Sequence, residues 1–281
     1  MKLSIFPNFG ALNSKPVFEA FTQGAVKLGH EVVVHDLSAD VYVIWSVLWH
    51  GRMQQNLEIW NYAKIHKKQV IVLEVGALKR GTTWRVGLGH INANGTFNND
   101  INLENGRSKK LGIFLKPWKK TGEHVLICGQ HSKSEQWSLR PPPEVWLQNL
   151  VDEIKKHTDR KIIFRPHPRD FQWCKNREIS GIFTNFPKKI SGTADDYDHE
   201  NDFTSAWCVV NPSSNTGILA AINGIPVLCD SDSLAWEISM KFPEKIESPD
   251  YVDRTHWLEK ISHTEWSIEE IQAGIPLKRL M

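Results

Sequence analysis

Short apolar runs that alternate with helical patterns constrain the fold of this chain more than any other feature. In residues 1–76, the runs KLSIF, HEVVVHD, VYVIWS and QVIVLEVG are interrupted by two segments with helical signals, 13–29 and 56–68. Strands that alternate with helices in this way are typical of an open parallel sheet. The sequence therefore predicts an α/β domain with a β-α-β-β-α-β series in this region.

A second series of the same kind begins at residue 124, and 281 residues are enough for two domains of ordinary size. The runs HVLICGQ, KIIF, WCVVN and PVLCD are predicted as strands, and PPPEVWLQNLVDEIKKHT, GILAAING and LAWEISMKF as helices. Residues 77–108 are rich in Gly, Asn and Thr and are expected to form loops, followed by a strand at KKLGIFL. We expect domains at 1–122 and 123–260, and a helical tail at 261–281.

Composition and charge favour a soluble, cytoplasmic protein. The chain is 41% hydrophobic and 23% charged, and its net charge of +2 means that any nucleic-acid contact has to come from a local patch. The four cysteines include no CxxC pair, so no zinc site is expected, and Cys128, Cys208 and Cys229 lie in apolar runs, which we interpret as reduced core positions. The start MKLSIFPNFG lacks the apolar length of a signal peptide, and no stretch approaches about 20 apolar residues, so no membrane span is expected.

Three polar segments follow predicted strands of the second domain: CGQHSKS (128–134), RPHP (165–168) and NPSSNTG (211–217). Parallel strands bring their carboxyl ends to one edge of a sheet, where ligands bind. The prolines of RPHP stiffen the backbone and hold Arg165 and His167 as outward-facing donors, while NPSSNTG opens a helix whose N–H groups and dipole attract an anion. A turn with incidental polar residues and an ordinary N-cap are the alternatives. The predicted diphosphate or phosphodiester site comprises Gln130, Ser132, Arg165, His167, Ser213, Ser214, Asn215 and Thr216.

The motifs LICGQ, RPHP and NPSSNTGILAAINGIPVLCD occur in this order between residues 125 and 238. This segment resembles the nucleotide-sugar domain of GT-B glycosyltransferases, especially bacterial capsule-type enzymes with an HP motif and a serine motif. The resemblance implies two Rossmann-like parallel-sheet domains that face a cleft, and donor phosphates bound by His167, Ser213 and Ser214. It implies a UDP-, CDP- or CMP-linked sugar as the donor. The chain lacks the DxD metal motif of GT-A enzymes, and DSD at 230–232 is better interpreted as a turn, so no metal is expected.

GT-B enzymes keep the acceptor on the N-terminal domain, so the catalytic base is expected in the first half of the chain. Glu74 ends the predicted strand VIVLE, where a carboxylate can take the proton of an acceptor hydroxyl. Asp100 is the next candidate. The alternative is a structural Glu74 that pairs with Arg80 or Arg85.

The segment NGRSKKLGIFLKPWKK (105–120) contains six cations and no acidic residue, with two aromatic residues between them. Such a strip can follow a phosphate backbone, although a solvated linker is the more frequent meaning of a charge run. Segments in the first half resemble proteins encoded by bacteriophages, which use GT-B enzymes to glycosylate hydroxymethylcytosine in DNA. We expect acceptor contacts from His50, Arg52, Arg85, Lys109, Lys110 and Trp118.

These observations leave three interpretations of function. The preferred one is transfer of a sugar from a nucleotide sugar to hydroxymethylcytosine in double-stranded DNA, in the host cytoplasm if the chain is encoded by a bacteriophage. The second is the same chemistry on a capsule or lipopolysaccharide glycan. The third is a nucleotide-binding module without catalysis, because one fold hosts many functions.

Overall fold

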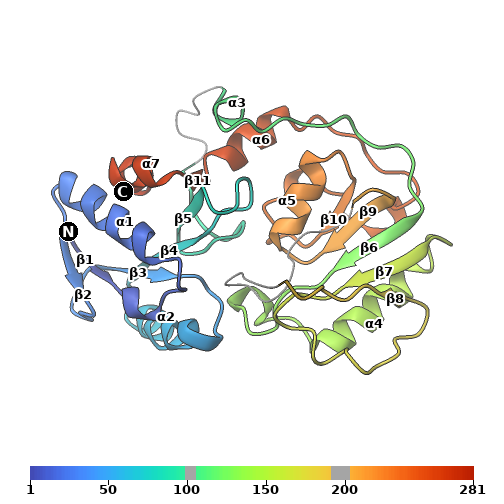
Figure 1. Ribbon diagram of the computed structural model, residues 1–281, viewed down its shortest axis with the longest axis horizontal. Coiled ribbons are helices and arrows are strands. Elements are labelled where there is room, and N and C mark those ends of the chain that lie inside the picture. The colour runs from blue at the N-terminus through green and yellow to red at the C-terminus, as the bar shows by residue number, and fades with distance from the viewer. Residues whose placement is uncertain (99–105, 191–202) are drawn as a thin grey trace. The chain divides into compact units, whose positions relative to one another are not determined.

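The computed structural model describes residues 1–98, 106–190 and 203–281 and divides the chain into two compact units. Unit 1 contains residues 1–113 and 259–281, and unit 2 contains residues 114–258. Helix α6 (Thr255–Ser262) carries the chain from unit 2 back into unit 1 (Figure 1). The C-terminal segment, which was expected to be a separate tail, is therefore part of unit 1.

Unit 1 is built on a six-stranded sheet with the order β11-β5-β4-β3-β1-β2. The four strands predicted in residues 1–76 are present and pair in parallel, whereas β5 and β11 are antiparallel additions. The strands are β1 (Lys2–Ile5), β2 (Glu31–Val34), β3 (Val41–Trp45), β4 (Gln69–Val75), β5 (Trp84–Leu88) and β11 (Glu265–Trp266). The helices are α1 (Lys15–Lys27), α2 (Asn56–Ile65), α3 (Arg107–Lys110), α7 (Ile268–Gln272) and α8 (Ile275–Leu280), with 3-10 turns η1 (Pro7–Phe9) and η2 (Gly51–Gln55).

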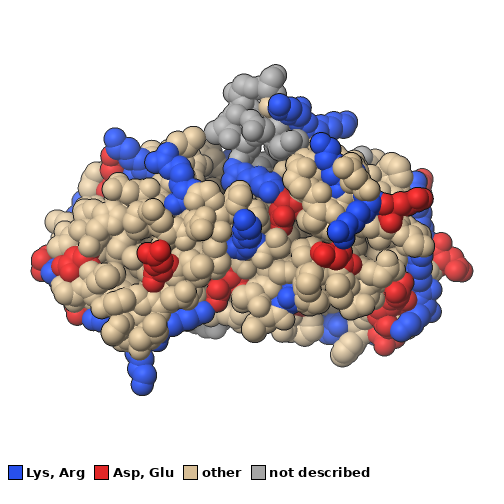
Figure 2. Space-filling view, turned by 90° about the horizontal axis from the view of Figure 1, so that it is seen from below, with Lys and Arg blue, Asp and Glu red and all other residues tan. Residues whose placement is uncertain are grey.

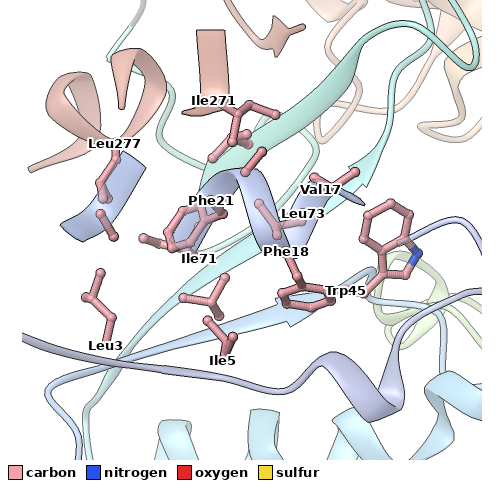
Figure 3. Packing of buried hydrophobic residues seen from close by; sticks show 14 of the residues in the cluster. Leu3, Ile5, Val17, Phe18, Phe21, Trp45, Ile71, Leu73, Ile271 and Leu277 are labelled. Atoms are coloured by element: carbon pink, nitrogen blue, oxygen red, sulfur yellow. The ribbon is translucent and has the colours of Figure 1, made fainter. Parts of the chain in front are cut away.

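The core of unit 1 joins the two ends of the chain. Phe18 and Phe21 on α1 are buried at the spacing expected of one helix face, and they pack on apolar side chains of β1, β3 and β4. Ile271 and Leu277 from the C-terminal segment enter the same cluster (Figure 3). Helix α1 and helix α7 are in close contact, so the C-terminal segment completes a core that residues 1–113 leave open.

A buried polar network fixes the C-terminal segment to the sheet of unit 1. The Glu265 carboxylate is fully buried and accepts hydrogen bonds from the amides of Ala77 (2.6 Å) and Leu78 (3.0 Å). It also accepts from Thr83 Oγ1 (2.9 Å) and pairs with Arg85 (2.9 Å), its register partner on β5. A buried carboxylate is stable only with such partners, so these bonds fix the position of β11.

Arg107, on α3 near the end of the first segment of unit 1, adds further hydrogen bonds to this network. Its guanidinium donates to the carbonyls of Ser262 and Glu265 and forms a two-pronged ion pair with Glu270 at 2.7 and 2.9 Å. Burial raises the pKa of Glu270, but the hydrogen bonds from Arg107 and the Ser267 amide and the nearby charges of Arg107 and Lys110 together outweigh it, and the net pKa is lowered. Arg107 also lies over the ring of Trp266, which adds a cation–π contact.

Unit 2 has a five-stranded parallel sheet with the order β10-β9-β6-β7-β8. The strands are β6 (His124–Cys128), β7 (Lys161–Arg165), β8 (Phe183–Thr184), β9 (Ala206–Asn211) and β10 (Val227–Cys229). The helices are α4 (Pro143–Ile154) and α5 (Asn215–Ile222), with 3-10 turns η3 (Glu135–Trp137), η4 (Trp236–Ile238) and η5 (Pro243–Lys245). All six residues of β9 are buried, as expected for a strand covered on both faces.

The cysteines confirm the interpretation as reduced core residues. All four are buried free thiols. Burial raises the pKa of Cys128 and of Cys208 to about 12, so neither thiol is activated as a nucleophile. In the part of the chain that the structure describes, no helix has the length and apolar character that crossing a bilayer needs.

Three secondary-structure predictions are wrong, two of them for a tertiary reason. Strand β5 lies within the expected loop region, where Gly87 is required because a Cβ there would meet the carbonyl oxygen of His90 at 2.2 Å. KKLGIFL forms the end of α3 and an irregular segment rather than a strand. LAWEISMKF forms only the turn η4, because the Met240 amide donates to Val227 at 2.7 Å and so extends the chain beside β10.

Candidate functional site

The three polar segments that follow strands of unit 2 meet at one edge of its sheet. Strands β9, β6 and β7 are adjacent and parallel, so their carboxyl ends lie side by side. The Gly129 amide donates to the Arg165 carbonyl at 2.8 Å, which joins the first segment to the second. The side chain of Gln130 joins the first to the third, because its Oε1 accepts from the Ser213 amide at 3.1 Å. The structure thus brings together the segments that the sequence analysis singled out.

Gln130 and Asn211 each have one polar atom that is paired and one that is not. Gln130 is only 7% exposed, and its Oε1 also accepts from Ser213 Oγ at 3.3 Å. Asn211 is 1% exposed, and its Nδ2 donates to the carbonyl and the hydroxyl of Ser214, both at 3.2 Å. Gln130 Nε2 and Asn211 Oδ1 have no hydrogen-bond partner among the described residues. Leaving such groups buried and unpaired costs about 1–3 kcal/mol each, which a bound ligand could recover.

The start of α5 is not capped in the ordinary way. Ser214 is the N-cap residue and has extended backbone angles, but its side chain makes no capping hydrogen bond. Its Oγ accepts from Asn211 instead. Ser214 therefore does not form the ordinary N-cap that was the alternative interpretation. Its hydroxyl does not offset the positive end of the α5 dipole. Ser214, Asn215 and Thr216 are all partly exposed.

Arg165 does not face outward as predicted. It is 7% exposed, its NH1 lies 3.4 Å from the carbonyl of Asn185, and burial lowers the pKa of its guanidinium. The reason is that Arg165 is the last residue of β7, a strand inside the sheet, rather than the first residue of the loop. His167, two residues further on, is partly exposed and lies in the loop.

Two residues near His167 were not singled out by the sequence analysis. The ring of His131 lies 5.2 Å from that of His167 and is buried. Asp170 accepts a hydrogen bond from the amide of Ser132 at 2.6 Å, and its Oδ2 lies 3.5 Å from His131 Nδ1. Ser132 thus takes part through its backbone. The available signal was that His131 stands inside CGQHSKS and Asp170 two residues after the HP motif.

DSD at 230–232 is a turn, as expected. Asp230 and Asp232 both form ion pairs with Arg140, at 2.8 and 2.7 Å. Among the described residues, no group of three or more His, Cys, Asp or Glu side chains is arranged to hold a metal ion.

In unit 1, the residues predicted to act on the acceptor have different environments. Glu74 is partly exposed on β4, and its Oε1 accepts from the amide of Val75 at 2.8 Å. Asp100 lies outside the described residues. Arg85, although it is the register partner of Glu74, is 3% exposed and bound to Glu265, so the predicted acceptor contact is wrong for Arg85.

His50 and Arg52 are exposed and follow β3. Arg52 borders a hollow of about 640 Å³ between the end of β1 and helix α1. Phe18, Leu12 and Ile5 provide an apolar wall of this hollow, and Asn8 and Glu19 are among its polar residues. The hollow therefore offers both apolar and hydrogen-bonding surface to a small ligand.

Two of the six cations of the basic strip are occupied in contacts inside the protein, as is Trp118, whereas Lys116 and Lys120 are exposed. Arg107 is buried on Glu270, and Lys119 donates to the carbonyls of Phe203 and Thr204. Trp118 donates from Nε1 to Val252 and lies under Arg254, 3.6 Å from ring centroid to guanidinium carbon. On the face visible in Figure 2, Lys and Arg side chains are interspersed with acidic ones.

Lys109 and Lys110 remain exposed. Lys110 Nζ lies 3.9 Å from Glu270, which offsets part of its charge. The strip therefore does not offer six accessible cations to a polyanion.

No protein-family model matches the chain, and no curated protein matches its sequence. Two solved structures of Thermosulfurimonas dismutans KpsC are similar to it. The beta Kdo 2,4 transferase has a TM-score of 0.54 and 12% identity, over 94% of this chain and 90% of the other. The beta Kdo 2,7 transferase has a TM-score of 0.55 and 12% identity, over 100% and 99%. Both similarities concern the fold, and they confirm the prediction of an α/β chain with the two-domain, Rossmann-like architecture of GT-B glycosyltransferases.

Proposed function

We propose that this chain is a glycosyltransferase that takes a sugar from a nucleotide-sugar donor, with the donor phosphates bound at the strand ends of unit 2. The observation that carries the proposal is the buried, unpaired Nε2 donor of Gln130, which lies beside the serines that begin α5. The fold likeness to the two Kdo transferases supports the same reaction class.

The chemistry of the strand-end cluster suits a phosphate held mainly by neutral donors. Gln130 Nε2 offers N–H groups, Ser213 and Ser214 offer hydroxyls, and the α5 dipole favours negative charge. His167 adds an imidazole at the edge of the cluster. Because Arg165 is buried, it would attract the phosphate through its charge rather than bind it with two hydrogen bonds from its guanidinium. The sugar nucleotide is proposed to be linked to UDP, CDP or CMP.

For the acceptor we propose a saccharide hydroxyl bound on unit 1, with Glu74 as the base. The hollow beside Arg52 has the size and mixed lining that a sugar-sized group requires, and Glu74 stands apart from its lining, on β4. Hydroxymethylcytosine in DNA is the other candidate acceptor. The exposed Lys109 and Lys110 favour it, but the internal contacts of Arg107 and Lys119 remove cations that a DNA groove would need.

A mass-spectrometric transfer assay tests both parts of this proposal. The enzyme is incubated with a panel of UDP-, CDP- and CMP-sugars, and with either glycan fragments or hydroxymethylcytosine DNA. We expect transfer to a glycan. Transfer to the DNA alone would overturn the saccharide acceptor but keep the enzyme class, and nucleotide binding with neither transfer nor hydrolysis would identify a binding module.

In the same assay, Glu74→Gln should lower turnover about a hundredfold or more, because the amide cannot accept the acceptor proton. Its nucleotide affinity should be unchanged. Glu31→Gln, at an exposed carboxylate on β2 of the same sheet, is the matched control and should keep wild-type turnover. Turnover of Glu74→Gln within a few-fold of wild type would assign Glu74 a structural role.

A further inference from the structure

The two histidines at the strand ends of unit 2 are held in the same way by their own loops. His131 Nδ1 lies 3.2 Å from the amide of Lys133, and His167 Nδ1 lies 3.1 Å from the amide of Arg169. In each case the amide two residues further on donates to Nδ1. A neutral imidazole whose Nδ1 accepts carries its hydrogen on Nε2. This contact sets His167 as an Nε2–H donor, and it favours the same tautomer in His131, where the competing Asp170 Oδ2 lies further from Nδ1, at 3.5 Å.

These two donors belong to one cluster. His131 follows β6 and His167 follows β7, which are adjacent strands, and their ring centroids are 5.2 Å apart with the planes inclined by 60°. His131 comes directly after Gln130, whose Nε2 is one of the unpaired buried atoms. Donors on two rings at this separation can reach different oxygens of one phosphate or of two linked phosphates.

Asp170 connects the two histidine loops. Its amide donates to the carbonyl of His167 at 2.9 Å, and its carboxylate accepts from the amide of Ser132 at 2.6 Å. The same carboxylate lies 3.5 Å from His131 Nδ1. A shift of Asp170 would therefore move the Ser132 backbone and the His131 ring together.

We propose that His131 is a second phosphate-binding residue of the donor site, donating from Nε2 alongside His167, and that Asp170 is its positioning residue. This inference rests on the proposed function, because it names a further residue for the same donor phosphates. No covalent step is involved. The alternative role for a buried histidine is packing alone, which the substitutions below distinguish.

Calorimetric titration of the full chain with UDP, CDP and CMP tests the role of His131. His131→Leu should weaken binding of the preferred nucleotide by about tenfold to a hundredfold, as expected for loss of a hydrogen bond to a charged group. His131→Gln, whose Nε2 can replace the lost donor, should recover most of the affinity. His157→Gln, at a part-buried histidine that follows α4 and pairs with Glu153, is the matched control and should bind as wild type.

Asp170 is tested by rescue and by a double mutant. Asp170→Ala should weaken nucleotide binding, whereas Asp170→Asn keeps an acceptor for the Ser132 amide and should recover most of it. The double mutant His131→Leu/Asp170→Ala should lose less affinity than the sum of the two single losses, since part of the effect of Asp170 passes through the ring. Additive losses would overturn the positioning role, even if both single variants are folded.

The outcomes separate this inference from the function on which it rests. If wild type binds none of the three nucleotides, the proposed function fails. If wild type binds a nucleotide, His167→Ala weakens that binding and His131→Leu does not, the proposed function stands and the second phosphate-binding residue is refuted. Thermal unfolding of each variant shows that the chain remains folded during the titration.

Discussion

Two buried polar clusters in this molecule differ in how completely their atoms are paired. In unit 1, the Glu265 carboxylate accepts four hydrogen bonds, and all three guanidinium nitrogens of Arg107 donate. In unit 2, the cluster at the strand ends leaves Gln130 Nε2 and Asn211 Oδ1 without partners among the described residues.

The difference teaches how each cluster is used. In the cluster of unit 1, the polar atoms bind one another, so the cluster stabilises structure. Here it holds the C-terminal segment on the sheet. In the cluster of unit 2, buried polar atoms are left without a hydrogen-bond partner among the described residues. This is the arrangement expected of a site whose hydrogen bonds a ligand completes. Perturbing the first should change stability, and perturbing the second should change binding.

The largest change in stability is expected from removing Glu265 from the buried cluster of unit 1. Glu265→Ala leaves Arg85 as a buried charge without its carboxylate and frees the amides of Ala77 and Leu78, so the free energy of unfolding should fall by about 3–5 kcal/mol. Chemical denaturation of the full chain measures this change. Glu58→Ala, at an exposed carboxylate on α2, is the control and should stay within about 0.5 kcal/mol of wild type. A loss of similar size in both variants would contradict a special role for Glu265.

A smaller effect is expected where the C-terminal segment packs on α1. A Cβ at Gly24 would lie 2.3 Å from the carbonyl oxygen of Ile271, so Gly24→Ala forces α1 and α7 apart. We expect a loss of about 1–3 kcal/mol in the free energy of unfolding, typical of overpacking. Val26→Ala, at a side chain of the same helix that is 57% exposed, is the matched control. Unchanged stability in Gly24→Ala would show that the segment is not held there.

The sequence predicted the local elements of this fold better than their long-range partners. The four parallel strands of unit 1 and four of the five in unit 2 were visible as apolar runs, since burial on both faces requires such runs, whereas the two-residue strand β8 was not predicted. β5 was not, because Gly87 inside it and the Gly- and Thr-rich residues around it imitate a loop. The pairing of β11 with β5, which places the C-terminal segment in unit 1, depends on the ion pair between Glu265 and Arg85. These residues are 180 positions apart, so no local sequence pattern indicates their contact.

The site shows the same limit. The segments that meet at the strand ends of unit 2 were predicted, because parallel topology alone brings carboxyl ends together. The orientation of individual side chains was not: Arg165 is buried, while His131 and Asp170 join the cluster unpredicted. Those details depend on which loop amide reaches which ring nitrogen, and this is decided by three-dimensional packing.

The central claim is that the cluster of unit 2 binds the phosphates of a nucleotide, and Gln130→Glu tests it most directly. The carboxylate keeps an oxygen for the Ser213 amide but replaces the spare N–H donor by an acceptor, so it should repel a phosphate. Gln130→Met is uncharged and also lacks the N–H donor, so it provides a second test in case the buried carboxylate of Gln130→Glu prevents folding. Calorimetry should show that wild type binds UDP, CDP or CMP, and that both variants bind it about tenfold or more weakly while retaining their unfolding midpoints. Equal affinity in wild type and both folded variants, or no nucleotide binding by wild type, would contradict the claim.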